Sequence, residues 1–83
     1  MKAKLINTQR NPSKYGGYFW YFFFKLEDGR SARSCISEKM RNFRNWKELC
    51  GKEDIELDGL FFTRSGIIDA DSNPKIINNG QTS

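Results

Sequence analysis

The residues of this chain that could do chemistry are aromatic and cationic. Seven consecutive residues, 18–24, are aromatic, out of twelve aromatic residues in a chain of 83. Successive side chains of a strand point to opposite faces, so this run places rings on both faces of a sheet. One face can fill a core. The other must meet a second core, an oligomer interface or a flat ligand, because large exposed apolar patches usually mark interaction sites.

Groups that could catalyse a reaction or bind a metal are few. The chain has no histidine, which is the commonest general base and metal ligand. Segment 69–73 begins like a calcium loop, but Pro74 occupies the position that needs glycine, which favours a polar turn with Asp and Ser side chains bonded to the backbone. Cys35 and Cys50 lack CxxC spacing, so we expect two reduced, partly buried thiols. The sequence therefore predicts a protein that is not an enzyme, with no cofactor and no metal.

Charge is distributed unevenly along the chain. Residues 1–47 carry eleven Lys and Arg against three Asp and Glu, whereas residues 48–83 carry three against seven. A basic half that also holds the aromatic run favours a polyanionic partner, most naturally a nucleic acid. The alternative is that the cations only keep an unusually aromatic strand soluble.

Length and hydropathy limit the remaining possibilities. A chain of 83 residues forms one domain. It has no run of about 18 apolar residues to span a membrane, and its start, Met1-Lys2-Ala3-Lys4, leads into a polar stretch instead of a signal peptide. We therefore expect a single domain of residues 1–77 in the cytoplasm, with no membrane partner, followed by a disordered tail of residues 78–83.

The pattern of apolar residues and turn residues predicts a mainly β fold. The first four expected strands cover residues 2–8, 18–26, 30–36 and 55–63. The fifth expected strand begins at 67–70 and continues at 75–77 after a bend. Segment 10–17 contains one proline and two glycines and is expected to be a loop.

A short helix is expected between the third and fourth strands. Asn42 can cap this helix, and Gly51 is a natural residue to end it. Its apolar stripe consists of Phe43, Trp46, Leu49 and Cys50. This spacing predicts that the helix packs Phe43 and Trp46 into the core.

The turn between the second and third strands decides which rings face outward. With a two-residue loop at Asp28-Gly29, Phe19, Tyr21 and Phe23 share a face with Ala32 and Ile36. With a three-residue loop that ends in Gly29 as a bulge, the apolar set is Trp20, Phe22, Phe24, Leu26, Ala32 and Ile36. We favour the second register because it separates core from surface. Its outward set is Phe19, Tyr21, Phe23 and Lys25 with Ser31, Arg33 and Cys35.

The order β-β-β-α-β-β, with the helix after the third strand, is similar to that of the OB-fold, a five-stranded, partly open Greek-key barrel. The resemblance covers residues 2–77 and rests on topology. Within it, the chain resembles the small single-stranded DNA-binding proteins of phages and mobile elements, which stack bases on the face of the second and third strands. Bacterial single-strand binding proteins usually end in an acidic tip that recruits partners, whereas Gln81-Thr82-Ser83 is uncharged.

This resemblance implies a binding site without catalysis. It places Phe19, Tyr21, Phe23, Lys25 and Arg33 on the binding face, and Arg10, Lys14, Tyr15 and Arg64 in flanking loops. Rings on a sheet can stack bases of any sequence, and cations can neutralise phosphates. The expected partner is single-stranded DNA. RNA stays open as a partner, because nothing in the sequence is identified as reading a 2′-hydroxyl.

Two other functions remain open. The aromatic face could close a homodimer or dock on a host protein as a small inhibitor would, because Tyr, Trp, Phe and Arg are also enriched in protein interfaces. The second is an SH3-like or Sm-like barrel that binds RNA. In Sm-like chains the helix precedes the strands, whereas here the helical stripe follows the third strand.

Overall fold

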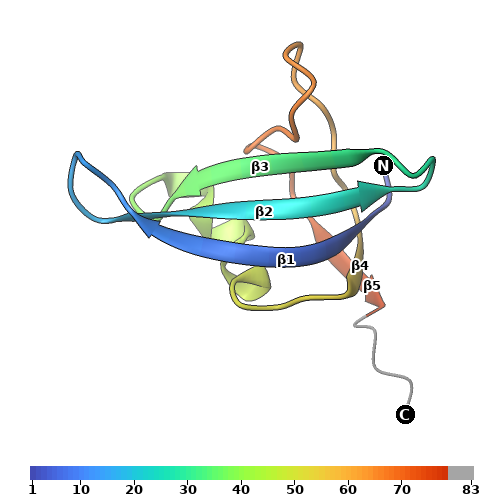
Figure 1. Ribbon diagram of the computed structural model, residues 1–83, viewed down its shortest axis with the longest axis horizontal. Coiled ribbons are helices and arrows are strands. Elements are labelled where there is room, and N and C mark those ends of the chain that lie inside the picture. The colour runs from blue at the N-terminus through green and yellow to red at the C-terminus, as the bar shows by residue number, and fades with distance from the viewer. Residues whose placement is uncertain (79–83) are drawn as a thin grey trace.

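The computed structural model describes residues 1–78, which form a mainly β structure with five antiparallel strands in one sheet. Two short 3-10 helices lie between the third and fourth strands, η1 (Arg41–Asn45) and η2 (Lys47–Leu49). The strands are β1 (Ala3–Pro12), β2 (Tyr18–Leu26), β3 (Ser31–Ser37), β4 (Ile55–Asp58) and β5 (Lys75–Asn78), in the spatial order β3-β2-β1-β4-β5 (Figure 1). The predicted order of strands and helix is therefore confirmed. The expected tail at 78–83 begins within β5, and its residues 79–83 lie outside the described residues.

The sheet is open in residues 1–78, so the closed form of the expected barrel is not seen. Its two edges are β3 and β5. The chain after β4 reaches β3 through one backbone hydrogen bond, in which the N–H of Ile68 donates to the carbonyl of Arg33 at 3.0 Å. One bond of this kind does not continue a strand ladder.

The fourth and fifth strands are shorter than predicted. Gly59 has a φ of 86°, and a Cβ at this position would lie 2.5 Å from the carbonyl oxygen of Asn73. The chain therefore turns sharply after Asp58. The prediction of strand at 59–63 is wrong, and so is the prediction that the fifth strand begins at 67–70. Residues 59–74 form a long connection with a single bridge between Phe62 and Ile68. The fifth strand is the segment that starts at Lys75.

β1 is longer than predicted, which removes part of the expected loop at 10–17. It pairs with β2 from Ala3 opposite Leu26 to Pro12 opposite Tyr18, and with β4 only over its first three residues. The pairing with β2 is interrupted by a bulge between Leu5 and Asn7. Beyond the bulge β1 has one neighbouring strand, so polar residues and a terminal proline are tolerated there.

The turn between β2 and β3 has the favoured three-residue form. The N–H of Leu26 donates to the carbonyl of Arg30 at 2.8 Å, and Gly29 adopts a φ of 89°. Phe24 faces Ala32 and Phe23 faces Arg33 across the two strands. These strand pairs are those of the second register, which is therefore confirmed, with Gly29 as the bulge residue at positive φ.

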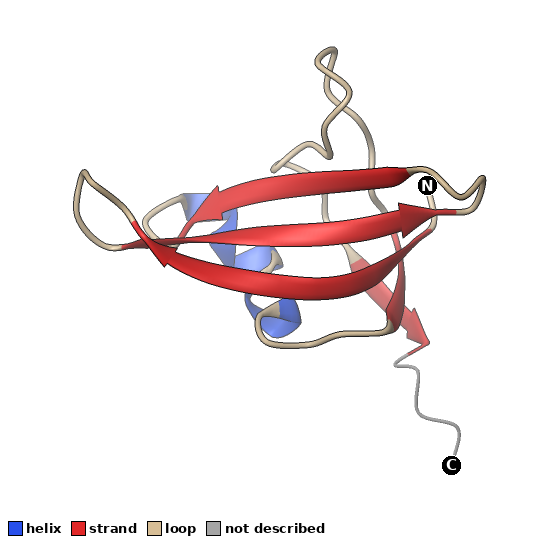
Figure 2. Ribbon diagram, viewed as in Figure 1, coloured by secondary structure: helices blue, strands red, loops and turns tan. Residues whose placement is uncertain are grey.

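The core lies on one side of β1, β2 and β3. Figure 2 shows both helices on that side, behind the three long strands. The core is built around Trp46, which is fully buried. The centroid of its ring lies 5.0 Å from the ring centroid of Phe22 and 6.2 Å from that of Phe24. Leu49 is also buried, and Phe43 and Cys50 pack against the cluster as partly buried residues. The predicted apolar stripe is confirmed.

The helix differs from the prediction in type and in its cap. Successive backbone bonds join residues three apart, from Phe43 N–H to Met40 O at 3.1 Å and from Trp46 N–H to Phe43 O at 2.9 Å, so the turns are 3-10 and not α. Asn42 is not the cap. Its Nδ2 instead donates to the carbonyl of Ala70 at 2.7 Å, which ties the helix to the connection between β4 and β5.

Candidate functional site

The three long strands present two different faces. One face covers the core. The other, here called the outer face, consists of Lys4, Asn7, Gln9 and Asn11 from β1, Phe19, Tyr21, Phe23 and Lys25 from β2, and Ser31, Arg33, Cys35 and Ser37 from β3. In Figure 1 this face is turned toward the viewer, and the helices, the long connection and β4 and β5 lie behind it. No segment of residues 1–78 covers the outer face.

Three rings form a continuous row along the outer face of β2. Phe19 and Tyr21 meet edge to face with their centroids 5.2 Å apart, and Tyr21 and Phe23 are tilted with centroids 6.0 Å apart. All three side chains are partly buried, because they cover one another and the strands beneath them. A row of mutually packed rings is a fixed platform on which flat ligands can stack.

Cations lie beside this row at the end nearer the β2–β3 turn. Arg33 stands directly opposite Phe23, and Lys25 stands directly opposite Lys4. Lys4 lies 4.0 Å from the carboxylate of Asp54, whereas neither Lys25 nor Arg33 forms an ion pair within residues 1–78. Like charges directly opposite each other destabilise a sheet. An anion bound between Lys4 and Lys25 would remove that cost.

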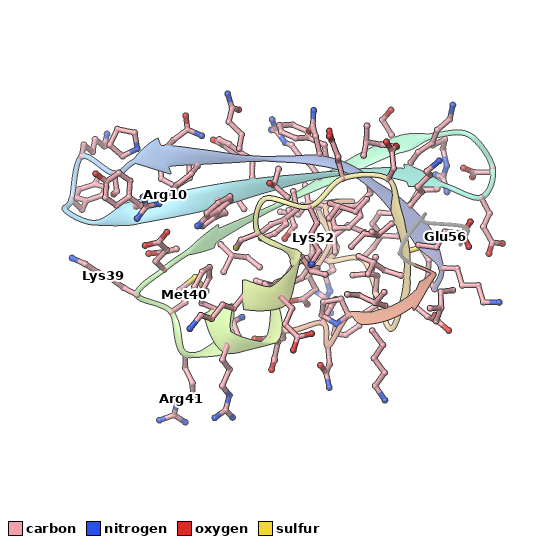
Figure 3. All side chains as sticks on the ribbon, turned by 90° about the horizontal axis from the view of Figure 1, so that it is seen from below. Arg10, Lys39, Met40, Arg41, Lys52 and Glu56 are labelled. Atoms are coloured by element: carbon pink, nitrogen blue, oxygen red, sulfur yellow. The ribbon has the colours of Figure 1, made fainter. Side chains whose placement is uncertain are left out.

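Arg10 lies in a strand and not in the expected loop, and it is on the face that covers the core. It stands opposite Trp20, and its guanidinium bonds to both carboxylate oxygens of Glu38, at 2.8 and 3.2 Å. The guanidinium also lies 3.7 Å from the centroid of the Tyr18 ring. Figure 3 shows Arg10 on the same side of the sheet as Lys39. The sequence could not reveal this pairing, because Glu38 is 28 residues away from Arg10.

Glu38 joins β1, β2 and the end of β3 at one end of the sheet. Besides Arg10, the indole Nε1 of Trp20 donates to its carboxylate at 2.7 Å. The hydrogen bonds from Arg10 and then from Trp20 hold the pKa of Glu38 below its usual range. The charge of Arg10 is therefore already compensated, and its geometry suits a role in stability better than one in binding.

The expected loop residues lie at two separate places. Lys14 and Tyr15 are in the 13–17 loop between β1 and β2, where Tyr15 is 84% exposed and the ammonium of Lys14 lies 5.3 Å from its ring centroid. Arg64 is exposed in a turn that the N–H of Gly66 closes by bonding to the carbonyl of Thr63 at 3.0 Å. Figure 1 shows this turn projecting past β3, away from the 13–17 loop.

Sequence reasoning missed the contribution of β1 to the outer face. Lys4, Asn7, Gln9 and Asn11 lie beside the rings, whereas the predicted first strand ended at residue 8. No pattern in the sequence marked these positions, because residues 7–11 are all polar and show no alternation. The bulge at Ile6 also shifts the faces by one residue relative to the start of the strand.

The acidic segment and the two thiols do not form a reactive site. Within residues 1–78 no three His, Cys, Asp or Glu side chains are close enough to hold a metal ion. Asp69 accepts a bond from the N–H of Asp71 at 2.8 Å, which is the predicted polar turn. Both cysteines are free. Burial raises the pKa of Cys50 to about 11, so this thiol is protonated at neutral pH.

Cys35 differs from the prediction, because it is exposed on the outer face opposite Tyr21 and not partly buried. Burial of its sulfur still raises its pKa above the ordinary value. Neither thiol therefore has the lowered pKa of a reactive cysteine.

No protein-family model matches this chain, and comparisons with curated proteins and with solved structures give no significant match. None of the helices in residues 1–78 has the length and apolar character needed to cross a bilayer.

Proposed function

We propose that this protein binds single-stranded nucleic acid on its outer face, without catalysis and largely without regard to sequence. The observation that carries the proposal is an uncovered sheet face with three packed rings in a row and two cations, Lys25 and Arg33, that have no ion-pair partner within residues 1–78. Every base has a π-face, so each ring can stack a base at about 1–3 kcal/mol. DNA is preferred to RNA only because of the resemblance described above.

We also infer that the fold is a partly open OB-like Greek-key barrel. Four antiparallel pairings support this, namely β1 with β2, β2 with β3, β1 with β4, and β4 with β5. The helices between β3 and β4 support it too, and the bond from Ile68 to Arg33 brings the later chain against β3. OB-folds bind nucleic acid on the face of strands 2 and 3 and on the loops after strands 1 and 4. Those loops here hold Lys14, Tyr15 and Arg64.

The charges on the outer face suit phosphate binding. Lys25 and Lys4 face each other, and Arg33 adjoins the ring of Phe23. A single strand whose bases stack on the rings would have phosphates within reach of these cations. Each phosphate contact releases counterions and contributes about −0.7 to the slope of log K against log salt concentration.

A protein interface is the second candidate function. β3 is an edge of the sheet, and the outer rings lie on the strand next to it. A second copy or a host protein could use both the edge and the rings, since edge strands readily pair with other chains. In that case the rings would be buried by protein and would not bind bases.

The deciding experiment removes Tyr21 and Phe23 together. We expect Tyr21→Ala/Phe23→Ala to lose at least tenfold in affinity for an oligothymidine, on the basis of about 1–3 kcal/mol per stacked base. The measurement is the fluorescence anisotropy of a dye-labelled oligothymidine at two salt concentrations, with the variant's fold checked by circular dichroism. The dependence of affinity on salt should stay as in the wild type, because no cation has been removed.

Ile76→Ala is the control. Ile76 is 39% exposed but lies in β5, and it belongs neither to the outer face nor to the loops after β1 and β4. It should bind the oligothymidine as the wild type does. If the double variant keeps full affinity but changes from dimer to monomer in sedimentation, the protein-interface function is the correct one.

A further inference from the structure

The connection between β3 and β4 carries a second set of cations that the outer face does not include. Arg41, Arg44 and Lys47 are three residues apart along η1 and η2, and all three are exposed. We call them the basic row. In a 3-10 helix, side chains at i and i+3 lie one above the other. Arg41 and Arg44 therefore lie one above the other on η1, about 6 Å apart at a rise of about 2.0 Å per residue, and Lys47 follows at the start of η2.

The same spacing holds the basic row in place. Phe43, Trp46 and Leu49 form the neighbouring line, and Trp46 and Leu49 are buried in the core. The indole Nε1 of Trp46 donates to the carbonyl of Ala70 at 3.0 Å. At the end of the helices, the N–H of Gly51 donates to the hydroxyl of Thr8 in β1 at 2.9 Å. The cations thus stand on a backbone that is fixed to the core and to the sheet.

The cations of the basic row outnumber the carboxylates beside them. None of the three forms an ion pair within residues 1–78. A shallow groove beside the row is lined by Met40, Arg41, Asn42, Arg44, Asn45 and Asp71. The carboxylate of Asp71 accepts a bond from the Nδ2 of Asn42 at 3.1 Å and forms no ion pair with the row. An excess of cations fixed along a groove is typical of a polyanion site.

Lys39 and the 13–17 loop connect the basic row to the outer face. The stem of Lys39 lies against Gly17, where a Cβ would be 3.0 Å from its Cε. The N–H of Glu38 donates to the carbonyl of Tyr18 at 3.0 Å, so the start of the connection is attached to the start of β2. Figure 3 shows Lys39, Met40 and Arg41 following one another at the end of the sheet that also holds Arg10. The row of rings ends at Phe19, next to this same loop.

We propose that a bound single strand leaves the outer face at Phe19, passes around the 13–17 loop and continues with its phosphates along the basic row. This inference rests on the proposed function and extends it, because it adds a phosphate-binding segment on the opposite side of the sheet. The bases stack on the outer rings, whereas the basic row contacts only the backbone. The row therefore lengthens the binding site and adds no sequence preference.

The test compares two probe lengths. Oligothymidines of about 5 and about 15 nucleotides span the range of site sizes found for single OB-folds. With oligonucleotide in excess, the wild type should bind the long probe more tightly. Arg41→Gln/Arg44→Gln should lose most of this gain and lower the salt slope for the long probe by about 1.4, from two phosphate contacts at about 0.7 each. Its affinity for the short probe should not change.

Lys52→Gln/Lys75→Gln is the matched control, since it removes the same charge from two exposed positions outside the row and the outer face. It should behave as the wild type with both probes. If Arg41→Gln/Arg44→Gln keeps the full gain with length while the outer-ring variant loses binding, this inference alone is overturned and the row is left to an acidic protein partner. If the wild type binds neither probe, the proposed function fails and this inference fails with it.

Discussion

The two faces of β2 are both built from aromatic residues but differ in how deeply these residues are buried. On the inner face, Phe22 and Phe24 are 0% and 1% exposed and pack against Trp46. On the outer face, Phe19, Tyr21 and Phe23 pack mainly on one another and remain partly exposed. The difference comes from the other described residues, up to residue 78, which lie over one side of the three long strands (Figure 1).

This comparison shows that aromatic content alone does not define a core. A core needs a second element that presents apolar side chains, and here η1, η2 and the connection after β4 supply it. Within residues 1–78 the outer rings have no such partner and stay partly exposed. The inner rings should therefore determine stability and the outer rings should determine binding. Substitutions on each face can test this division.

The first test replaces two neighbouring residues of β2 by alanine, one in each variant. Phe22→Ala should lower the free energy of unfolding by about 3–5 kcal/mol, because it leaves a cavity beside Trp46. Phe23→Ala should lower it by only about 1 kcal/mol, which is typical of an average substitution. Chemical denaturation of both variants measures the difference. Equal losses would mean that both faces are buried in the folded protein.

The second test concerns the polar end of the inner face. Because Arg10 and Trp20 lower the pKa of Glu38, this carboxylate stabilises the folded state fully above its unfolded pKa of about 4.3. The contribution is lost as the pH falls below that value through the folded pKa. Glu38→Gln should therefore be less stable than the wild type at pH 7 and should lose less stability on acidification.

Thermal unfolding between pH 7 and pH 3 measures this effect. Glu48→Gln is the matched control, because Glu48 is exposed and forms no ion pair within residues 1–78. An acid dependence of Glu38→Gln equal to that of the wild type would show that the Arg10 pairing does not stabilise the fold.

The smallest expected effect belongs to a single outer cation. Lys25→Gln should leave the free energy of unfolding unchanged or raise it slightly, because the exposed side chain loses its like-charge contact with Lys4. It should reduce the salt slope of oligothymidine binding by about 0.7, the value for one phosphate contact on a single strand. Titrations at several salt concentrations give the slope. A lower unfolding free energy with an unchanged slope would assign Lys25 to the fold and not to the ligand.

Local patterns predicted the elements that depend on neighbouring residues. The Gly29 bulge and the register of β2 and β3 followed from the need to keep apolar side chains together. The stripe of Phe43, Trp46 and Leu49 followed from its spacing. That spacing of three also fits a 3-10 helix, which the prediction of an ordinary helix overlooked.

Long-range contacts account for what the sequence could not predict. β1 extends to Pro12 because its backbone pairs with β2, although its residues there are polar. Arg10 forms an ion pair with Glu38 on the inner face. Asn42 donates a hydrogen bond to the carbonyl of Ala70 and does not cap the helix. The early end of β4 depends on Asn73, whose carbonyl lies against Gly59. None of these partners is close in the sequence.

The bulge at Ile6 has a consequence for how this protein can change in evolution. It lets Lys4 and Asn7 lie on the same face although they are three residues apart. Leu5 and Asn7 pair with the adjacent residues Phe24 and Phe23, so deleting Ile6 would remove the bulge and leave the other side chains of β1 on their present faces. Loss of one residue should therefore be tolerated at the bulge, whereas loss of one residue between 7 and 12 would turn part of the strand to the wrong side.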